Sequence, residues 1–230
     1  MPISTTQPLD WPDWLRRWDA MQMLYLAERE ARFNIMLDVL DALLPTEFFA
    51  LDLACGPGAI SQRLLTRFPK ARAVAVDLDP LLLALGQGAI GTQNGRLRWV
   101  EADIAAEDLA KRLAAGPFDA VLSTTALHWL SAEQLVRLYR QLGDLVRPGG
   151  VFLNGDHLKF GPDLPAFQEL GKALHAHDVT HGTGETWEQW WEAVANEPRF
   201  GELLAERTRR FPAQTATPAF HHRQQHVHRH

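Results

Sequence analysis

The sequence predicts an α/β fold built on a doubly wound, mostly parallel sheet. Two short runs, 48–53 and 71–76, are continuously apolar, as strands that are buried on both faces tend to be. A glycine turn at 55–58 joins the first run to an amphipathic helix over 59–68. A strand, a glycine turn and a helix in this order form a ligand-binding corner.

Length and composition fit one such domain with added segments. The chain has 230 residues, of which 46% are hydrophobic, and this is ample for a core. A net charge of −5 gives no general attraction to nucleic acid or to an anionic membrane, so we expect a small-molecule partner. Cys55 is the only cysteine, which excludes an intrachain disulfide and a CxxC zinc site. With no signal peptide and no long apolar run, we expect a cytoplasmic protein that contacts no membrane.

Two helices are predicted in the amino-terminal region, 1–47. Asp10 is expected to cap the first helix, and Pro45 to follow the second. The first carries an aromatic stripe made of Trp11, Trp14, Trp18, Met21 and Tyr25, and the second an apolar stripe made of Phe33, Leu37, Leu40 and Leu44. We expect the second helix to pack on the sheet. For the first helix, packing and a lid over the ligand cleft remain equally open.

The glycine turn contains the first candidate binding residues. Gly56 and Gly58 have no Cβ, so a ligand can lie against the backbone, and the first N–H groups of the next helix favour an anionic group. The dinucleotide fingerprint G-x-G-x-x-G is a competing interpretation, but Ser61 stands where its third glycine would be. We expect Cys55 to be a small packed residue rather than a nucleophile.

Further candidates follow the next strands. A carboxylate at Asp77 can accept both hydrogen bonds of a ribose diol, and Leu78 offers an apolar surface for adenine. Asp79, ahead of Pro80, is better suited to cap a helix. Strands at 96–100 and 118–123 lead to the segments 101–104 and 124–130. The carboxyl ends of parallel strands meet at one edge, where ligands bind in open sheets.

A fifth strand is predicted at 151–154. It follows a helix that Ser131 and Gln134 cap as a capping box, with Leu135, Leu138, Leu142 and Leu145 on its inner face. The sequence Arg147-Pro148-Gly149-Gly150 is expected to end that helix.

The pattern D-x-x-x-G-x-G from Asp52 to Gly58 resembles the first motif of class I S-adenosylmethionine-dependent methyltransferases, which have a Rossmann-like fold. Ala54 replaces the common first glycine of that family. The resemblance covers 48–156, the expected cofactor-binding core, and the ALHWL segment at 126–130 looks most like the trans-aconitate-type branch. It implies S-adenosylmethionine as the cofactor, with Asp103 near the adenine amino group and Ile104 against the ring. The implied cofactor-binding residues are Asp52, Ala54, Gly56, Gly58, Asp77, Leu78, Asp103, Ile104 and Ser123.

Beyond residue 156 the resemblance weakens. We expect 157–211 to be a helical, substrate-covering segment, in which Thr186 and Gln189 cap one helix and 202–210 forms another. Three tryptophans on the first of these helices, Trp187, Trp190 and Trp191, are predicted to form a substrate wall, with plain packing as the alternative. The polar, histidine-rich stretch 212–230 is expected to be a disordered tail without a metal site, which leaves the sixth and seventh strands of the family missing.

The resemblance implies methyl transfer to a small-molecule carboxylate, hydroxyl or amine by direct in-line displacement. His128 is the candidate general base for a hydroxyl or amine, although a histidine packed at a helix entry is an equal alternative, and Trp129 can favour a positive sulfonium. A nicotinamide-dependent oxidoreductase is the second hypothesis, disfavoured by Ser61. A non-catalytic or degenerate cofactor-binding protein is the third. The acceptor and the oligomeric state stay open.

Overall fold

The computed structural model describes residues 8–26, 28–156, 164–170 and 184–211. Within these residues, five strands form one sheet in the order β3-β2-β1-β4-β5, and every neighbouring pair is parallel. The strands are β1 (Phe49–Leu53), β2 (Arg72–Asp77), β3 (Leu97–Glu101), β4 (Phe118–Thr124) and β5 (Val146–Gly155). The predicted doubly wound α/β fold is therefore confirmed.

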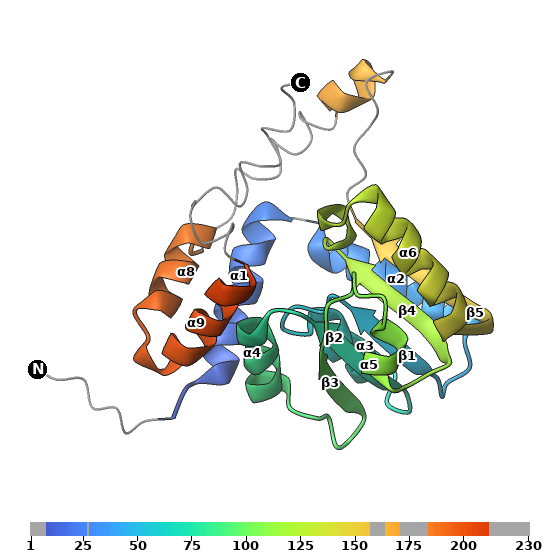
Figure 1. Cartoon of the computed structure of the whole chain (residues 1–230), viewed down its shortest axis with the longest axis horizontal. Helices are drawn as coiled ribbons and strands as arrows, with labels where there is room; N and C mark the ends of the chain where they lie inside the picture. The colour runs from blue at the N-terminus through green and yellow to red at the C-terminus, as the bar shows by residue number, and fades with distance from the viewer. Residues whose placement is uncertain (1–7, 27, 157–163, 171–183, 212–230) are drawn as a thin grey trace, which may run out of the picture.

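Helices cover both faces of the sheet (Figure 1). One face packs against α2 (Arg29–Leu43), α3 (Ala59–Arg67) and α4 (Pro80–Ile90), and the other against α5 (Leu109–Leu113) and α6 (Ala132–Leu145). Side chains alternate between the faces, as strand geometry requires. The first face presents mainly alanines, namely Ala50, Ala73, Ala75 and Ala120, whereas the second presents Leu51, Leu53, Val74, Val76 and Val121. The small side chains let the α2–α4 layer lie close to the sheet.

The first helix, α1 (Trp11–Tyr25), begins as predicted after Asp10, whose side chain accepts the Asp13 N–H. Its aromatic stripe packs against α4, α8 (Trp187–Ala195) and the short helix η3 (Pro198–Phe200). The Trp11 ring lies directly over Gly88 of α4. This face of α1 is thus part of a shared apolar core, and α2 packs on the sheet as expected.

Helix α6 ends at Leu145, just before Arg147 as expected, and the fifth strand covers the predicted residues 151–154 but is longer than predicted. Strand β5 already begins at Val146, and the stretch from Arg147 to Gly150 forms an irregularity inside it. Val146 pairs with Phe118 and Val151 pairs with Ala120, so the extra residues of β5 bulge out of the ladder. A proline cannot donate a ladder hydrogen bond, and such a bulge accommodates it at the edge of the sheet.

Both edges of the described sheet lack a second neighbour, but they differ in character. Strand β3 carries Arg98 and Glu101, and charged side chains protect an edge from further pairing. Strand β5 reads Val-Phe-Leu-Asn over 151–154 and runs beside a groove of about 460 Å³ against α2. No strand corresponding to the family's sixth or seventh is found among the described residues, and the expected tail, 212–230, lies outside them.

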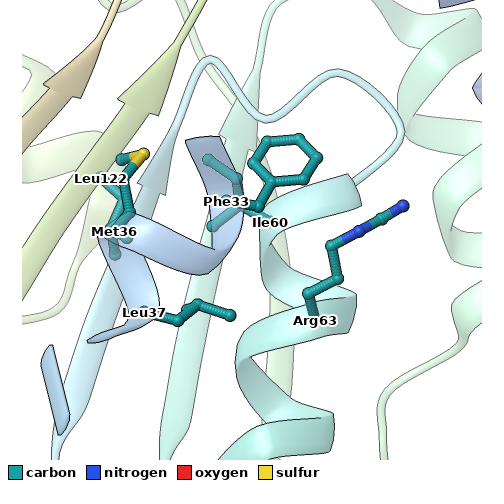
Figure 2. A pocket seen from close by; sticks show the side chains of 6 residues that line it. All are labelled: Phe33, Met36, Leu37, Ile60, Arg63 and Leu122. Carbon is teal, nitrogen blue, oxygen red and sulfur yellow. The ribbon is translucent and has the colours of Figure 1, made fainter. Parts of the chain in front are cut away.

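A second hollow lies under α2. Figure 2 shows this small pocket between α2, α3 and β4, with the Arg63 side chain directed away from Leu122. It is lined by Phe33, Met36, Leu37, Ile60, Arg63 and Leu122, and it is too narrow to admit a water molecule. We interpret it as a packing crevice, because a site for a cofactor-sized ligand needs at least about 300 Å³.

None of the helices in the described part of the chain is both long and apolar enough to span a bilayer.

Candidate functional site

The loop between β1 and α3 has an unusual backbone. Ala54, Gly56 and Gly58 all have positive φ, at 57°, 53° and 84°. The Cys55 N–H donates to the carbonyl of Val76 at 2.9 Å, which ties the loop to β2, and the Gly58 N–H donates to the carbonyl of Cys55. The left-handed region favours glycine, so Ala54 holds a conformation that is strained for an L-residue.

The two glycines of the loop are required for different reasons. A Cβ on Gly56 would come no closer than 3.9 Å to any atom outside its neighbours, so one face of this residue is open. A Cβ on Gly58 would lie 2.4 Å from Cη2 of Trp99, a residue of β3. Gly58 therefore makes room for Trp99, and Gly56 has an open face. Ligand approach at both glycines stays a prediction.

Asp52 lies buried below the loop rather than on its surface. One of its carboxylate oxygens, Oδ2, accepts the Ser61 N–H at 3.0 Å and the Ser61 hydroxyl at 2.7 Å. Burial raises the pKa of Asp52 to about 6, although the hydrogen bonds from Ser61 act in the opposite direction. Asp52 therefore holds the first turn of α3 to β1, and this carboxylate already occupies part of the helix start that we expected to be free for a ligand.

Asp77 stands beside the open glycine. Its Oδ2 accepts the Gly56 N–H at 2.7 Å, and its Oδ1 accepts the Asp79 N–H at 2.8 Å. A carboxylate oxygen has more than one acceptor position, so both oxygens can still accept a ligand hydroxyl. Burial raises the pKa of Asp77 to about 6, against the effect of the Asp79 and Gly56 hydrogen bonds. Asp79 caps α4 through the N–H groups of Leu81 and Leu82, as predicted.

Cys55 packs into the apolar core, as expected from the sequence. It is buried, and burial raises the pKa of its thiol well above the ordinary value, with the charges of Asp52 and Asp77 adding to the effect. The thiol therefore stays protonated, and a thiol is a poor nucleophile.

The remaining predicted cofactor residues lie along the same edge. Asp103 is exposed just past β3, and its Oδ1 accepts the Ala105 N–H at 2.8 Å. Ile104 is half-buried and packs on the apolar core below it. Leu78 is half-buried at the end of β2. The hydroxyl of Ser123 is buried and donates to the carbonyl of Leu53 at 2.8 Å, so its proton is already committed to joining β4 to β1.

A histidine and an aspartate meet where β4 and β5 end. His128 belongs to the short helix η1 (Leu127–Trp129), and its Nδ1 lies 2.8 Å from Oδ1 and 3.0 Å from Oδ2 of Asp156. The His128 backbone N–H donates to Asp156 Oδ2 at 3.0 Å. The Trp129 ring is tilted against the imidazole, with 4.9 Å between centroids. Asp156 was not predicted from the sequence, although it lies two residues after the predicted strand 151–154, and a position just past a strand is the signal that identified Asp77.

Comparison with known proteins identifies the segment that holds these strand ends. Residues 50–150 match a family described as "Methyltransferase domain". This segment is a class I S-adenosylmethionine-dependent methyltransferase domain. The match gives no support to the nicotinamide-dependent alternative.

Named relatives of the methyltransferase domain agree with this. A malonyl-[acyl-carrier protein] O-methyltransferase from Legionella pneumophila is 33% identical over 127 residues, which are 55% of this chain and 40% of that protein. A trans-aconitate 2-methyltransferase from an Azoarcus species is 33% identical over 138 residues, which are 58% of this chain and 48% of that protein. The chain thus spans less than half the length of either relative.

A solved structure extends the likeness beyond the core. An O-methyltransferase family protein from Burkholderia thailandensis superposes with a TM-score of 0.50 at 22% sequence identity. The superposition covers 84% of this chain and 59% of that protein. At this level of identity the likeness shows a shared fold.

Helix α9 (Gly201–Arg210), which the sequence predicts from residue 202, reaches back to the methyltransferase domain. Arg207 Nε donates to Asp79 Oδ2 at 2.6 Å, and both side chains are nearly buried. Arg210 Nη1 donates to the carbonyl of Leu78 at 2.9 Å, and its Nη2 pairs with Glu101 of β3 at 2.7 Å. The Arg207–Asp79 and Arg210–Leu78 contacts join residues 128 and 132 positions apart in the sequence, and no local pattern predicts them.

The three tryptophans of α8 do not share one environment. Trp190 is completely buried, between Trp14 and Trp18 of α1. Trp187 and Trp191 are half-buried, and the Arg207 guanidinium lies 4.1 Å from the centre of the Trp191 ring. Trp187 and Trp191 thus keep part of their surface exposed, whereas Trp190 packs the helices together.

Proposed function

We propose that this chain binds S-adenosylmethionine at the carboxyl ends of β1, β2 and β3 and transfers its methyl group to a small-molecule acceptor by direct in-line displacement. The observation that carries the proposal is the pairing of Asp77 with the open face of Gly56 inside a methyltransferase domain. The name of one relative, trans-aconitate 2-methyltransferase, supports a small acceptor.

The residues present fit the adenosine part of this cofactor. Asp77 has acceptor positions left for a ribose diol, and Gly56 leaves space for a ligand against the backbone. Leu78 and Ile104 offer apolar side chains for the adenine ring, and the exposed Asp103 offers an acceptor for its amino group. When bound, S-adenosylmethionine supplies a methyl group on a positively charged sulfur. The protein then has to orient the acceptor and exclude water.

Residues near β4 and β5 are assigned to the acceptor side. His128 is the general base for a hydroxyl or amine acceptor, and Trp129, with 46% of its surface exposed, offers a ring face that favours positive charge. Trp187 and Trp191 form the substrate wall, which Trp190 supports from within. We keep the expectations of no nucleic-acid partner and a cytoplasmic location as predictions from the charge and the single cysteine.

Calorimetric titration with S-adenosylhomocysteine, with NAD as the competing ligand, tests the proposal. Asp77→Ala should weaken S-adenosylhomocysteine binding by roughly ten- to a hundredfold, because two hydrogen bonds to a charged acceptor are worth about 1.5–3 kcal/mol. Asp77→Asn, which keeps the shape of the side chain, should lose a large part of the same affinity.

Asp41→Asn is the matched control for these variants. Asp41 is an exposed carboxylate that pairs with Arg67 near the end of α3, away from the strand ends, so the variant should bind like the parent. An unchanged dissociation constant in Asp77→Ala would remove Asp77 from the site. Binding of NAD without binding of S-adenosylhomocysteine would reject the proposal as a whole.

A further inference from the structure

We infer that His128 and Asp156 act as a proton-accepting pair, and that the acceptor is therefore a molecule that loses a proton on methylation: an alcohol, a phenol or a protonated amine. His128 is the catalytic residue of the pair, and Asp156 is a positioning residue that acts through it. The inference rests on the proposed function and narrows its acceptor class.

The contacts of the pair fix the state of the imidazole. An ionised carboxylate only accepts hydrogen bonds, so the Nδ1 atom that faces both Asp156 oxygens carries the ring proton. In the neutral ring, Nε2 is then left with its lone pair and can accept a proton. Within the described residues, Nε2 makes no hydrogen bond of its own. The His128 backbone N–H donates to the same carboxylate, so Asp156 holds both the main chain of η1 and the imidazole ring.

The two side chains of the pair differ in burial. The Asp156 side chain is 2% exposed and the His128 side chain 27%, so the carboxylate is inside and the imidazole reaches the surface. Another charged group, Arg32 of α2, lies near Asp156. Burial lowers the pKa of the Arg32 guanidinium, whereas the charge of Asp156 and, to a smaller extent, that of Glu28 raise it. The buried carboxylate is thus placed to orient the imidazole through Nδ1.

The pair lies within reach of the cofactor corner. In the sheet order, β4 adjoins β1 and β5 adjoins β4, and His128 and Asp156 follow these two strands at their carboxyl ends. Neighbouring strands are about 4.8 Å apart, which places the pair roughly 5–10 Å sideways from the end of β1. An acceptor between the glycine loop and η1 would therefore meet the methyl group on one side and Nε2 on the other.

The chemistry balances only for an acceptor that has a proton to lose. The electron pair of the acceptor oxygen or nitrogen forms the new bond to the methyl carbon, and the electron pair of the broken carbon–sulfur bond stays on the departing sulfur. The proton of the acceptor passes to Nε2, and the imidazolium later releases it to water. A carboxylate is already ionised near pH 7, so the pair would have no proton to accept from it.

Two measurements test the inference. The first is the ring tautomer of His128 in the ligand-free chain, from ¹⁵N nuclear magnetic resonance assigned by difference with His128→Gln. We expect the Nδ1–H tautomer in the parent and a changed tautomer balance in Asp156→Asn, which a purely structural Asp156 would not produce. The second is release of S-adenosylhomocysteine with phenol and benzylamine as protic acceptors and with benzoate and trans-aconitate as carboxylate acceptors.

We expect turnover of a protic acceptor, a fall of about 10²- to 10⁴-fold in His128→Gln, and a smaller fall in Asp156→Asn. Asp41→Asn should keep the parent rate, and all variants should keep the parent melting temperature and cofactor affinity. A rate that His128→Gln leaves unchanged, or turnover confined to the carboxylates, overturns the inference. If none of the four acceptors reacts, the tautomer decides: Nδ1–H supports the pair and Nε2–H overturns it. Loss of S-adenosylhomocysteine binding in the parent would count against the proposed function instead.

Discussion

Replacing Gly58 by alanine should destabilise the chain much more than the same change at Gly56, two residues earlier in the loop. Both glycines have positive φ, so a new Cβ strains the backbone at either position. Only at Gly58 does the Cβ meet a rigid neighbour, Cη2 of Trp99 at 2.4 Å. The Trp99 ring has little freedom to move, because its Nε1 donates to the carbonyl of Gly91 at 2.8 Å and its Cη2 and Cζ3 atoms also lie close to Gly86.

The expected difference follows from three contributions. An alanine in the left-handed region costs about 1–2 kcal/mol, and loss of glycine freedom in the unfolded chain returns about 0.4–1 kcal/mol. Gly56→Ala should therefore lower the free energy of unfolding by roughly 0–1.5 kcal/mol. Overpacking adds about 1–3 kcal/mol at Gly58 alone.

Equilibrium urea unfolding measures this difference directly. With a slope of about 2 kcal/mol per molar, Gly58→Ala should unfold roughly 0.5–1.5 M earlier than Gly56→Ala. Trp99→Phe in the Gly58→Ala background should recover part of the loss, because the smaller ring leaves room for the Cβ. Equal midpoints for the two alanine variants, or no recovery with Trp99→Phe, would refute the packing argument.

Four further predictions concern the glycine loop, its two buried aspartates and helix α1. Ala54→Gly should raise the thermal midpoint slightly, by relieving a φ of 57° at a net gain of about 0.5 kcal/mol, and a lower midpoint would contradict the strain. Affinity for S-adenosylhomocysteine should fall as pH falls below about 6, by about tenfold at pH 5, because the proton then held by Asp77 blocks an acceptor position; Asp77→Asn should flatten that profile. The stability of the ligand-free chain should change in the opposite direction. Because the pKa values of Asp52 and Asp77 are raised in the folded state, that state binds more protons than the unfolded state between about pH 4 and 6. Urea midpoints should therefore fall as the pH rises across this range. If α1 is a lid, limited proteolysis within residues 1–32 should slow on adding S-adenosylhomocysteine, and identical cleavage would make α1 a packing helix.

Much of the fold could be predicted from the sequence because its signals are local. The capping boxes at Ser131 and Thr186 and the cap at Asp79 depend on residues two or three positions away, and all three are present in the structure. The buried strands follow from their continuous apolar runs, and the parallel order follows from the helices between them. The strand ends that gather at one edge could therefore be named before their geometry was known.

The interactions that the sequence did not reveal join distant segments. Trp99 looks like an ordinary residue of an edge strand, and only the sheet order places it under Gly58. The pairing of Asp156 with His128 depends on β5 lying beside β4. Trp190 belongs to a stripe that periodicity cannot divide into covered and open positions, and its complete burial depends on where α1 lies.

The two parts of the site differ in local stability because β5 lies at the edge of the described sheet. Strands β1 and β2, which hold Asp52 and Asp77, each pair with a strand on both sides, whereas in the described part of the chain β5 pairs only with β4. Strands at an edge open locally at a lower free energy than central ones, and amide hydrogen exchange measures this difference. Asp156 directly follows β5, so a brief separation of this strand would disconnect it from His128 while the glycine loop and Asp77 stayed folded. Cofactor binding and proton transfer would then depend on two separate cooperative units. Mild denaturant should therefore abolish proton transfer at a lower concentration than it abolishes cofactor binding.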